Sequence, residues 1–128
     1  AHPEILVIIT FGKFGAEGRD AVPLLMEKLK PAKEERHRAI IKSLGGIGAE
    51  ARQALPLLRA ELRDPASKDR ACAATALGCM GAAAQEAVAE LSAALKSDDD
   101  LLKQEARIAL DKIKRARAGL PMPKEEDF

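Results

Sequence analysis

Hydrophobic residues recur along this chain at a period of 33 positions, and the recurrence includes nearly all of the sequence. Leu44 is matched by Leu77, and the apolar residue three positions later, Ile47, is matched by Met80. A fixed period of this length is typical of repeat proteins, in which one supersecondary unit stacks on the next. Four copies share one register at the first of these positions, which is occupied by Phe11, Leu44, Leu77 and Leu110.

Each copy contains two apolar stripes with helical spacing. Within a stripe the apolar residues are three, four or seven positions apart, as from Leu58 to Leu62 or from Ala73 to Leu77. This spacing places them on one face of a helix and not on one face of a strand. We therefore predict an all-α fold of about seven helices, at 4–14, 16–30, 34–47, 49–63, 67–80, 82–96 and 99–117.

Glycine and proline mark the boundaries and the irregular points of these helices. Pro23 and Pro56 lie inside two predicted helices, which predicts a kink or a late helix start in both. Ala89 replaces the proline in the third copy, so we expect that helix to be straighter. Glycines that tolerate a positive φ follow the first stripe of three units, at Gly15, Gly48 and Gly81.

The segment Arg70–Gly81 resembles the short HEAT repeats of the phycobilisome-lyase type. Their units read roughly apolar-Arg-x-x-Ala-Ala-x-Ala-Leu-Gly-x-Ile-Gly, followed by Ala-x-Pro-x-Leu, and Arg36–Gly48 with Ala54–Leu58 form a second copy. The resemblance implies an α-solenoid, a right-handed superhelix of antiparallel helix pairs. We expect residues 1–118 to form a single HEAT-like repeat domain and residues 119–128 to form a flexible tail, a disordered linker or a short docking segment.

Several residues depart from the family pattern. The family arginine is present as Arg70, but His37 and Lys103 take its place in the neighbouring copies. The aliphatic residue that precedes it is replaced by Arg36 and by Asp69. We interpret His37 as a variant of the basic position of the repeat.

The last copy has lost both glycines of the motif, to Asp111 and Lys114. Its helix is therefore predicted to continue through Arg117, until Gly119 and Pro121 end it. A longer and more polar final helix is typical of a terminal cap in a repeat array.

In the family that the chain resembles, the helix with the Ala-Leu-Gly motif lines the concave face of the solenoid. The resemblance thus implies a partly apolar groove with a basic rim, and an ordinary solvated surface is the alternative interpretation. The candidate partner-binding residues are Ile9, Lys13, Arg38, Lys42, Cys72, Thr75, Cys79, Gln104, Glu105, Ile108 and Lys112.

The first predicted helix is apolar nearly all round, which indicates burial on two sides. Ile5, Leu6 and Ile9 form the additional apolar face. We expect the chain to be a fragment of a longer array in which a missing upstream helix packs there. A heterologous partner and self-association of two copies are the alternatives.

Composition narrows the classes of function. A net charge of +1, from 21 basic and 20 acidic residues, provides no bulk attraction to nucleic acid, and three phenylalanines are the only aromatic residues. No apolar run is long enough to span a membrane. Cys72 and Cys79, seven positions apart on one helix, are about 10.5 Å apart, too far for a disulfide, and reduced thiols suggest a cytoplasmic protein.

The sequence contains no recognisable catalytic constellation. Ser43 and Ser92 do not lie in a nucleophile motif. The sequence offers only two histidines, His2 and His37, and two cysteines as ligands for a metal site. We therefore predict no enzyme activity, no cofactor and no metal. The leading hypothesis is a scaffold that binds a protein or peptide on its concave face. The alternatives are a bilin lyase-like component and a HEAT-like domain that binds duplex DNA.

Overall fold

The computed structural model describes residues 20–29 and 34–120, and within them the chain contains helices and no strand. This confirms the predicted all-α class. No helix among these residues combines the length and the apolar character needed to cross a bilayer. The elements in chain order are α2 (Val22–Leu29), α3 (Glu34–Ile47), the 3₁₀ segment η2 (Gly48–Ala54), α4 (Leu55–Arg63), α5 (Arg70–Cys79), the 3₁₀ segment η3 (Gly81–Ala87), α6 (Val88–Ala94) and α7 (Asp100–Arg117).

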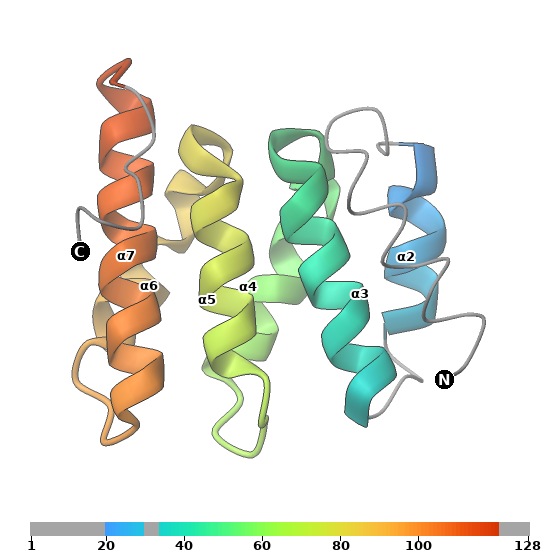
Figure 1. Cartoon of the computed structure of the whole chain (residues 1–128), viewed down its shortest axis with the longest axis horizontal. Coiled ribbons are helices and arrows are strands. Elements are labelled where there is room, and N and C mark those ends of the chain that lie inside the picture. The colour runs from blue at the N-terminus through green and yellow to red at the C-terminus, as the bar shows by residue number, and fades with distance from the viewer. Residues whose placement is uncertain (1–19, 30–33, 121–128) are drawn as a thin grey trace.

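The helices lie in two layers. In Figure 1, α3, α5 and α7 stand side by side and run in the same direction, while α4 and α6 lie behind them. Packing follows the same order, since α5 contacts both α3 and α7, and α4 contacts both α5 and α6. The helix α2 packs against α3 and η2 at the other end of the long axis from α7.

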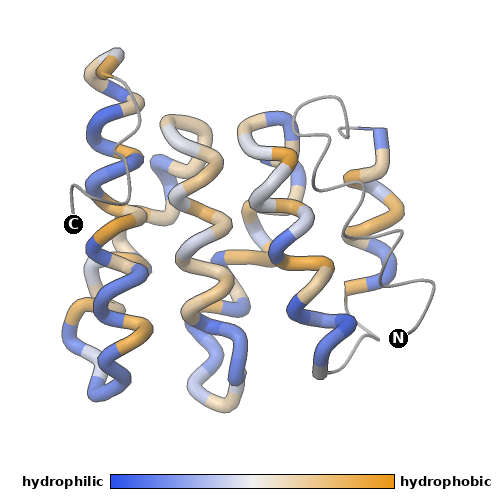
Figure 2. The backbone as a smooth tube through the Cα atoms, in the orientation of Figure 1, coloured by the Kyte–Doolittle hydropathy of each residue, from blue (hydrophilic) through white to orange (hydrophobic). Residues whose placement is uncertain are grey.

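The core lies between the layers and is built from the repeated apolar positions. Leu44 and Leu77 are fully buried, and so are Leu58 and Leu91 at equivalent places in the second half of two units. Figure 2 shows these apolar residues interspersed along each helix with hydrophilic ones. The buried apolar stripe of the second half-unit does not extend to Leu95. This residue is 41% exposed, whereas Leu62, at the equivalent position 33 residues earlier, is buried.

Glycines at the end of α3 and α5 have the backbone conformation that the sequence predicted. Gly48 has a φ of 77° and Gly81 a φ of 60°. Residues other than glycine rarely adopt a positive φ. Gly48 and Gly81 therefore allow the chain to reverse into the next segment. The last helix also ends where the sequence predicted, at Arg117.

The segments predicted as helices at 49–63 and 82–96 are each divided into a 3₁₀ segment and an α-helix. A 3₁₀ segment precedes the α-helix in both, with a break at Ala51 (φ −94°, ψ 15°) and at Ala84 (φ −93°, ψ 15°). Pro56 lies in the first turn of α4, so the expected late helix start is confirmed there. The expectation that Ala89 makes the third helix straighter is wrong, because η3 contains the same break, at Ala84, ahead of α6 and without a proline.

The division occurs both with and without proline. Ala51 and Ala84 have no exposed surface, and η2 packs directly against η3. The break in each unit thus lies at a buried alanine, where neighbouring units meet. Of the other predicted helices, 34–47 is confirmed, 67–80 begins later at Arg70, and 4–14 lies outside the described residues.

A second pair of glycines permits the close approach of neighbouring helices. A Cβ atom added to Gly45 would lie 2.9 Å from the Cα of Ala76, and one added to Gly78 would lie 2.8 Å from the Cα of Ala109. Both contacts are with backbone, which cannot move as a flexible side chain can. The contact of α3 with α5 and the contact of α5 with α7 therefore lie at the same repeat position, and each joins a glycine to an alanine.

An ion pair joins the helices of the other layer. Arg59 of α4 places its Nε 2.8 Å and one terminal nitrogen 2.7 Å from the Oε1 atom of Glu90 in α6. Burial alone raises the pKa of Glu90, but the hydrogen bond and positive charge of Arg59 outweigh it, so this pKa is lowered below the ordinary carboxyl value. The ionised carboxylate is thus the form that the fold favours.

We predict that Gly45→Ala lowers the free energy of unfolding by about 1 to 3 kcal/mol, because the added methyl group forces α3 away from α5. The measurement is urea denaturation followed by circular dichroism. The neighbouring Gly46 is exposed in the same helix and is the matched control, since Gly46→Ala should leave stability unchanged or slightly increased. Equal effects of the two substitutions would contradict the close contact.

We predict that the stabilisation from Glu90 depends on pH. A carboxyl group whose pKa is lowered by folding stabilises the protein above its unfolded-state pKa, and this contribution is lost as pH falls through the folded-state pKa. Glu90→Gln should therefore reduce the free energy of unfolding at pH 7, and the difference from wild type should shrink below about pH 4. A difference that stays constant between these pH values would show that the charge of Glu90 contributes nothing.

Candidate functional site

The layer formed by α3, α5 and α7 brings together nine of the residues predicted for partner binding. Each of them is exposed or half-buried, and none belongs to the core. We name these nine residues the α3–α5–α7 face: Arg38, Lys42, Cys72, Thr75, Cys79, Gln104, Glu105, Ile108 and Lys112. The remaining candidates, Ile5, Leu6, Ile9 and Lys13, lie outside the described residues.

Contacts across the three helices show that the members of this face are neighbours. The Oγ1 atom of Thr75 in α5 lies 2.8 Å from the Oε2 atom of Glu105 in α7. On the other side of α5, Arg38 and Lys42 are close enough to Cys72 to influence its titration. Side chains from all three helices therefore form one surface.

The middle of the α3–α5–α7 face is uncharged and made of small side chains. After Arg70, the only residues of α5 that reach solvent are Ala71, Cys72, Thr75 and Cys79. In Figure 2, α5 is correspondingly pale or apolar along its length, whereas α3 and α7 contain strongly hydrophilic residues. The uncharged strip thus has charged side chains on both sides.

The thiol within this strip is poorly suited to nucleophilic chemistry. Burial raises the pKa of Cys72, and the positive charges of Lys42 and Arg38 oppose that effect only in part. A thiol with a raised pKa remains protonated near neutral pH, and the thiolate is the reactive form. Cys72 therefore acts as a small residue packed against the core, whereas Cys79 is exposed at the end of the same helix.

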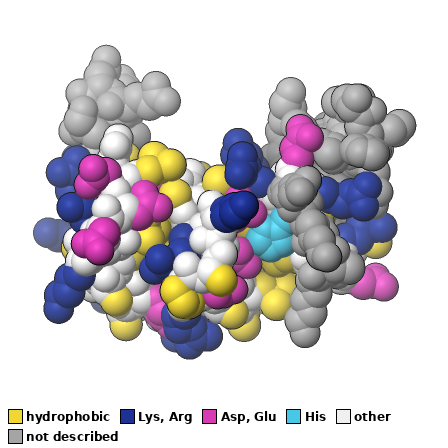
Figure 3. Space-filling model, turned by 90° about the horizontal axis from the view of Figure 1, so that it is seen from below, with side chains coloured by type: hydrophobic (Ala, Val, Ile, Leu, Met, Phe, Trp, Pro, Cys, Tyr) yellow, Lys and Arg dark blue, Asp and Glu magenta, His cyan; other side chains and the backbone are white. Residues whose placement is uncertain are grey.

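A second group of side chains meets where α3 begins and α4 passes into α5. The Nδ1 atom of His37 is 2.7 Å from the Oδ2 atom of Asp69, and its Nε2 atom is 3.3 Å from the Oε2 atom of Glu61. Arg38 donates from Nε to the other oxygen of Asp69 at 3.0 Å. We name these four residues the ionic cluster. Figure 3 views this end of the molecule and shows histidine at the surface with acidic and basic side chains around it.

His37 and Arg38 keep the aspartate of the ionic cluster ionised. Asp69 has only 8% of its side chain exposed, and this burial by itself raises its pKa. The hydrogen bonds and charges of His37 and Arg38 more than offset the burial, so that the pKa of Asp69 is lowered. The carboxylate therefore stays ionised and joins α3 to the start of α5.

Glu61 and Asp69 were not among the residues predicted for function. His37 was interpreted only as a variant of a basic repeat position, and the metal prediction considered only histidines and cysteines. In the structure, ligand atoms of His37, Glu61 and Asp69 all lie within 4.8 Å of one another. The available signal was that His37 and Asp69 both depart from the repeat pattern.

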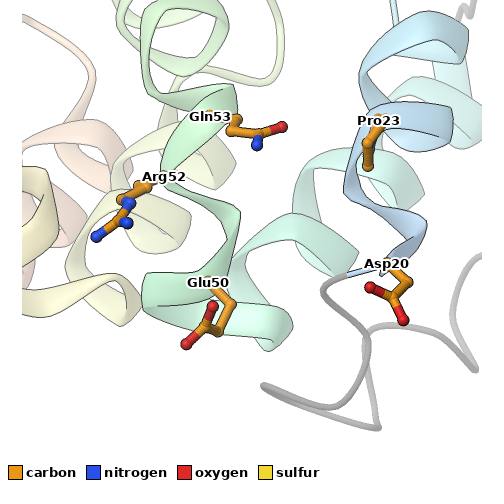
Figure 4. Close-up of a pocket in the computed structure, with 5 residues that line it drawn as sticks. All are labelled: Asp20, Pro23, Glu50, Arg52 and Gln53. Carbon is orange, nitrogen blue, oxygen red and sulfur yellow. The ribbon is translucent and has the colours of Figure 1, made fainter.

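A pocket of about 320 Å³ lies on the other side of the molecule, between the start of α2 and η2. As Figure 4 shows, Asp20 and Pro23 line one side, and Glu50, Arg52 and Gln53 line the other. Its lining contains one positive and two negative side chains and little apolar surface. Such a lining is typical of the junction between two packed units, and it indicates no particular ligand.

Comparison with known proteins provides no relative: no protein-family model matches the chain, and no curated protein or solved structure matches it. Function therefore has to be inferred from the α3–α5–α7 face and the ionic cluster.

We predict that Asp69→Ala lowers the free energy of unfolding by about 1 to 3 kcal/mol, because it leaves His37 and Arg38 without the partner they share. Chemical denaturation at pH 7 measures the effect. Glu105→Ala is the matched control, since Glu105 is half-buried on the same layer and accepts a hydrogen bond from Thr75. A loss for Asp69→Ala no larger than for Glu105→Ala would contradict a structural role for the ionic cluster.

Proposed function

We propose that this protein is a non-enzymatic HEAT-like α-solenoid that binds an acidic segment of another protein on the α3–α5–α7 face. Support for the architecture comes from the 33-position recurrence and from the equivalent contacts of Gly45 with Ala76 and of Gly78 with Ala109. Two layers of helices, with α3, α5 and α7 side by side, are compatible with it. The unpaired cysteines Cys72 and Cys79 favour a reducing, cytoplasmic setting.

The main observation behind the binding proposal is the uncharged strip of α5. A partner that covers Thr75 and Cys79 displaces water from small, weakly polar side chains and leaves no buried charge unpaired. Small side chains also leave room for a partner's main chain between the longer side chains of α3 and α7. The strip thus favours a peptide segment over a flat protein surface.

The flanks of the strip determine the charge of the proposed partner. Lys42 on α3 and Lys112 on α7 are basic, Arg38 is basic but already paired with Asp69 at 3.0 Å, and Glu105 is the single acidic member of the face. The Oε2 atom of Glu105 already lies within hydrogen-bond distance of Thr75. Carboxylates on a bound segment therefore find more complementary charge than ammonium groups do.

A rigid surface reduces the cost of such binding. Helices in close backbone contact keep their spacing before and after a partner binds, so little conformational entropy is lost by the protein. The binding free energy then comes from the contacts with the face itself. Among the described residues nothing favours the bilin lyase-like or the duplex DNA-binding hypothesis, and both stay predictions from the sequence.

We predict that peptides selected from a random display library against the full chain are enriched in aspartate and glutamate. Lys42→Glu/Lys112→Glu should raise their dissociation constant at least about tenfold, which corresponds to about 1.4 kcal/mol. Isothermal titration calorimetry with the selected peptides measures the change.

The matched control is Arg52→Glu/Lys96→Glu, which makes the same change in net charge at exposed residues outside the face. It should leave the dissociation constant within about twofold of wild type. Selected peptides without acidic enrichment, or equal weakening by both double variants, would contradict the proposal.

A further inference from the structure

Three side chains of the ionic cluster offer metal ligands from three different parts of the chain. His37 lies in α3, Glu61 in α4, and Asp69 immediately before α5. The imidazole and the Glu61 carboxylate are about one-sixth exposed, at 17% and 16%, so they are reachable from solvent without being surrounded by it. The candidate ligand atoms all lie within 4.8 Å of one another.

The separation of His37 and Glu61 is close to that of two ligands that share one ion. Neighbouring ligand atoms of a tetrahedral zinc ion lie about 3.4 Å apart, because the metal–ligand bonds are about 2.0 to 2.2 Å long. The Nε2 atom of His37 and the Oε2 atom of Glu61 are 3.3 Å apart. Asp69 lies against the other ring nitrogen, with its Oδ2 atom 2.7 Å from Nδ1, so its carboxylate has to leave Nδ1 and turn toward Nε2 to join the same ion.

Each carboxylate is also held by a hydrogen bond from outside the ligand set. Arg38 donates to Oδ1 of Asp69, which leaves Oδ2 facing the imidazole. Ser67 donates from its hydroxyl to Oε1 of Glu61, which leaves Oε2 facing the same ring. Hydrogen bonds of this kind fix the orientation of metal ligands in proteins.

The two residues of the set that break the repeat pattern occur in neighbouring copies. His37 replaces the arginine of its unit, and Asp69 replaces the aliphatic residue of the next. Packing of α3 against α5 brings these substitutions within 2.7 Å of each other. Residues that leave a repeat pattern and then meet in space are not required by the packing of the repeat itself.

We propose that His37, Glu61 and Asp69 bind one divalent transition-metal ion, with zinc as the best match. One imidazole and two carboxylates form a nitrogen–oxygen ligand set that suits zinc, whereas calcium and magnesium prefer oxygen ligands alone. Two carboxylates balance the charge of the ion, and water completes a four-coordinate site. The ion connects α3, α4 and the start of α5, so its binding should stabilise the folded chain.

Titration of zinc chloride alone into the full chain tests this site by isothermal calorimetry, with thermal unfolding as a second readout. We expect one ion per chain and a higher melting temperature with zinc. His37→Gln, Glu61→Gln and Asp69→Asn should each weaken binding at least about tenfold. The controls His2→Gln, Glu105→Gln and Cys72→Ala/Cys79→Ala remove other possible ligands and should bind as wild type does.

Three results would overturn the proposal: no zinc binding to the wild-type chain, binding that Glu61→Gln and Asp69→Asn leave unchanged, or binding lost in a control variant. If His37→Gln does not fold, X-ray absorption of the zinc-loaded wild-type chain decides. A shell of nitrogen and oxygen atoms with one imidazole supports the site. A sulfur ligand, or the lack of an imidazole signal, refutes it.

Discussion

The close backbone contact between neighbouring helices is the constraint on which the rest of the structure depends. Gly45 lies against Ala76 and Gly78 against Ala109, with no room for another methyl group at either point. The spacing of α3, α5 and α7 is therefore set by the smallest side chains available. In α7 the equivalent position is Asp111, which instead receives a hydrogen bond from Arg115 at 2.9 Å.

This spacing determines both groups of side chains that we connect with function. Because α3 and α7 approach α5 so closely, Lys42 and Glu105 lie at either side of its uncharged strip. The same approach brings His37 of α3 to Asp69 at the start of α5. The proposed binding face thus uses solvent-facing positions of the repeat, whereas the ionic cluster uses residues that depart from it.

Sequence periodicity predicted the helices best where one apolar stripe runs without interruption. The helices at 34–47 and at the C-terminal end follow the predicted bounds closely. It failed at Ala51 and Ala84, because the buried residues keep a helical spacing across the break and the apolar pattern does not reveal it. Pro56 correctly predicted a late helix start in its own unit. Proline is not required for it, since Ala89 occupies the equivalent place beside the same kind of break.

Nine candidate partner-binding residues lie outside the core, because a helical stripe that is buried on one side leaves its other side to solvent, and their role in binding stays a prediction. The ionic cluster was not predicted, since His37, Glu61 and Asp69 lie on separate elements and meet only through tertiary packing. Their departures from the repeat were visible, but the distances between them were not.

Amide chemical-shift mapping of the full chain with a selected acidic peptide tests most directly whether α3, α5 and α7 form the binding surface. We expect the shifts to concentrate at residues of the α3–α5–α7 face, including Lys42, Thr75 and Glu105. Shifts centred on η2, α4 and α6, with this face unchanged, would contradict the account.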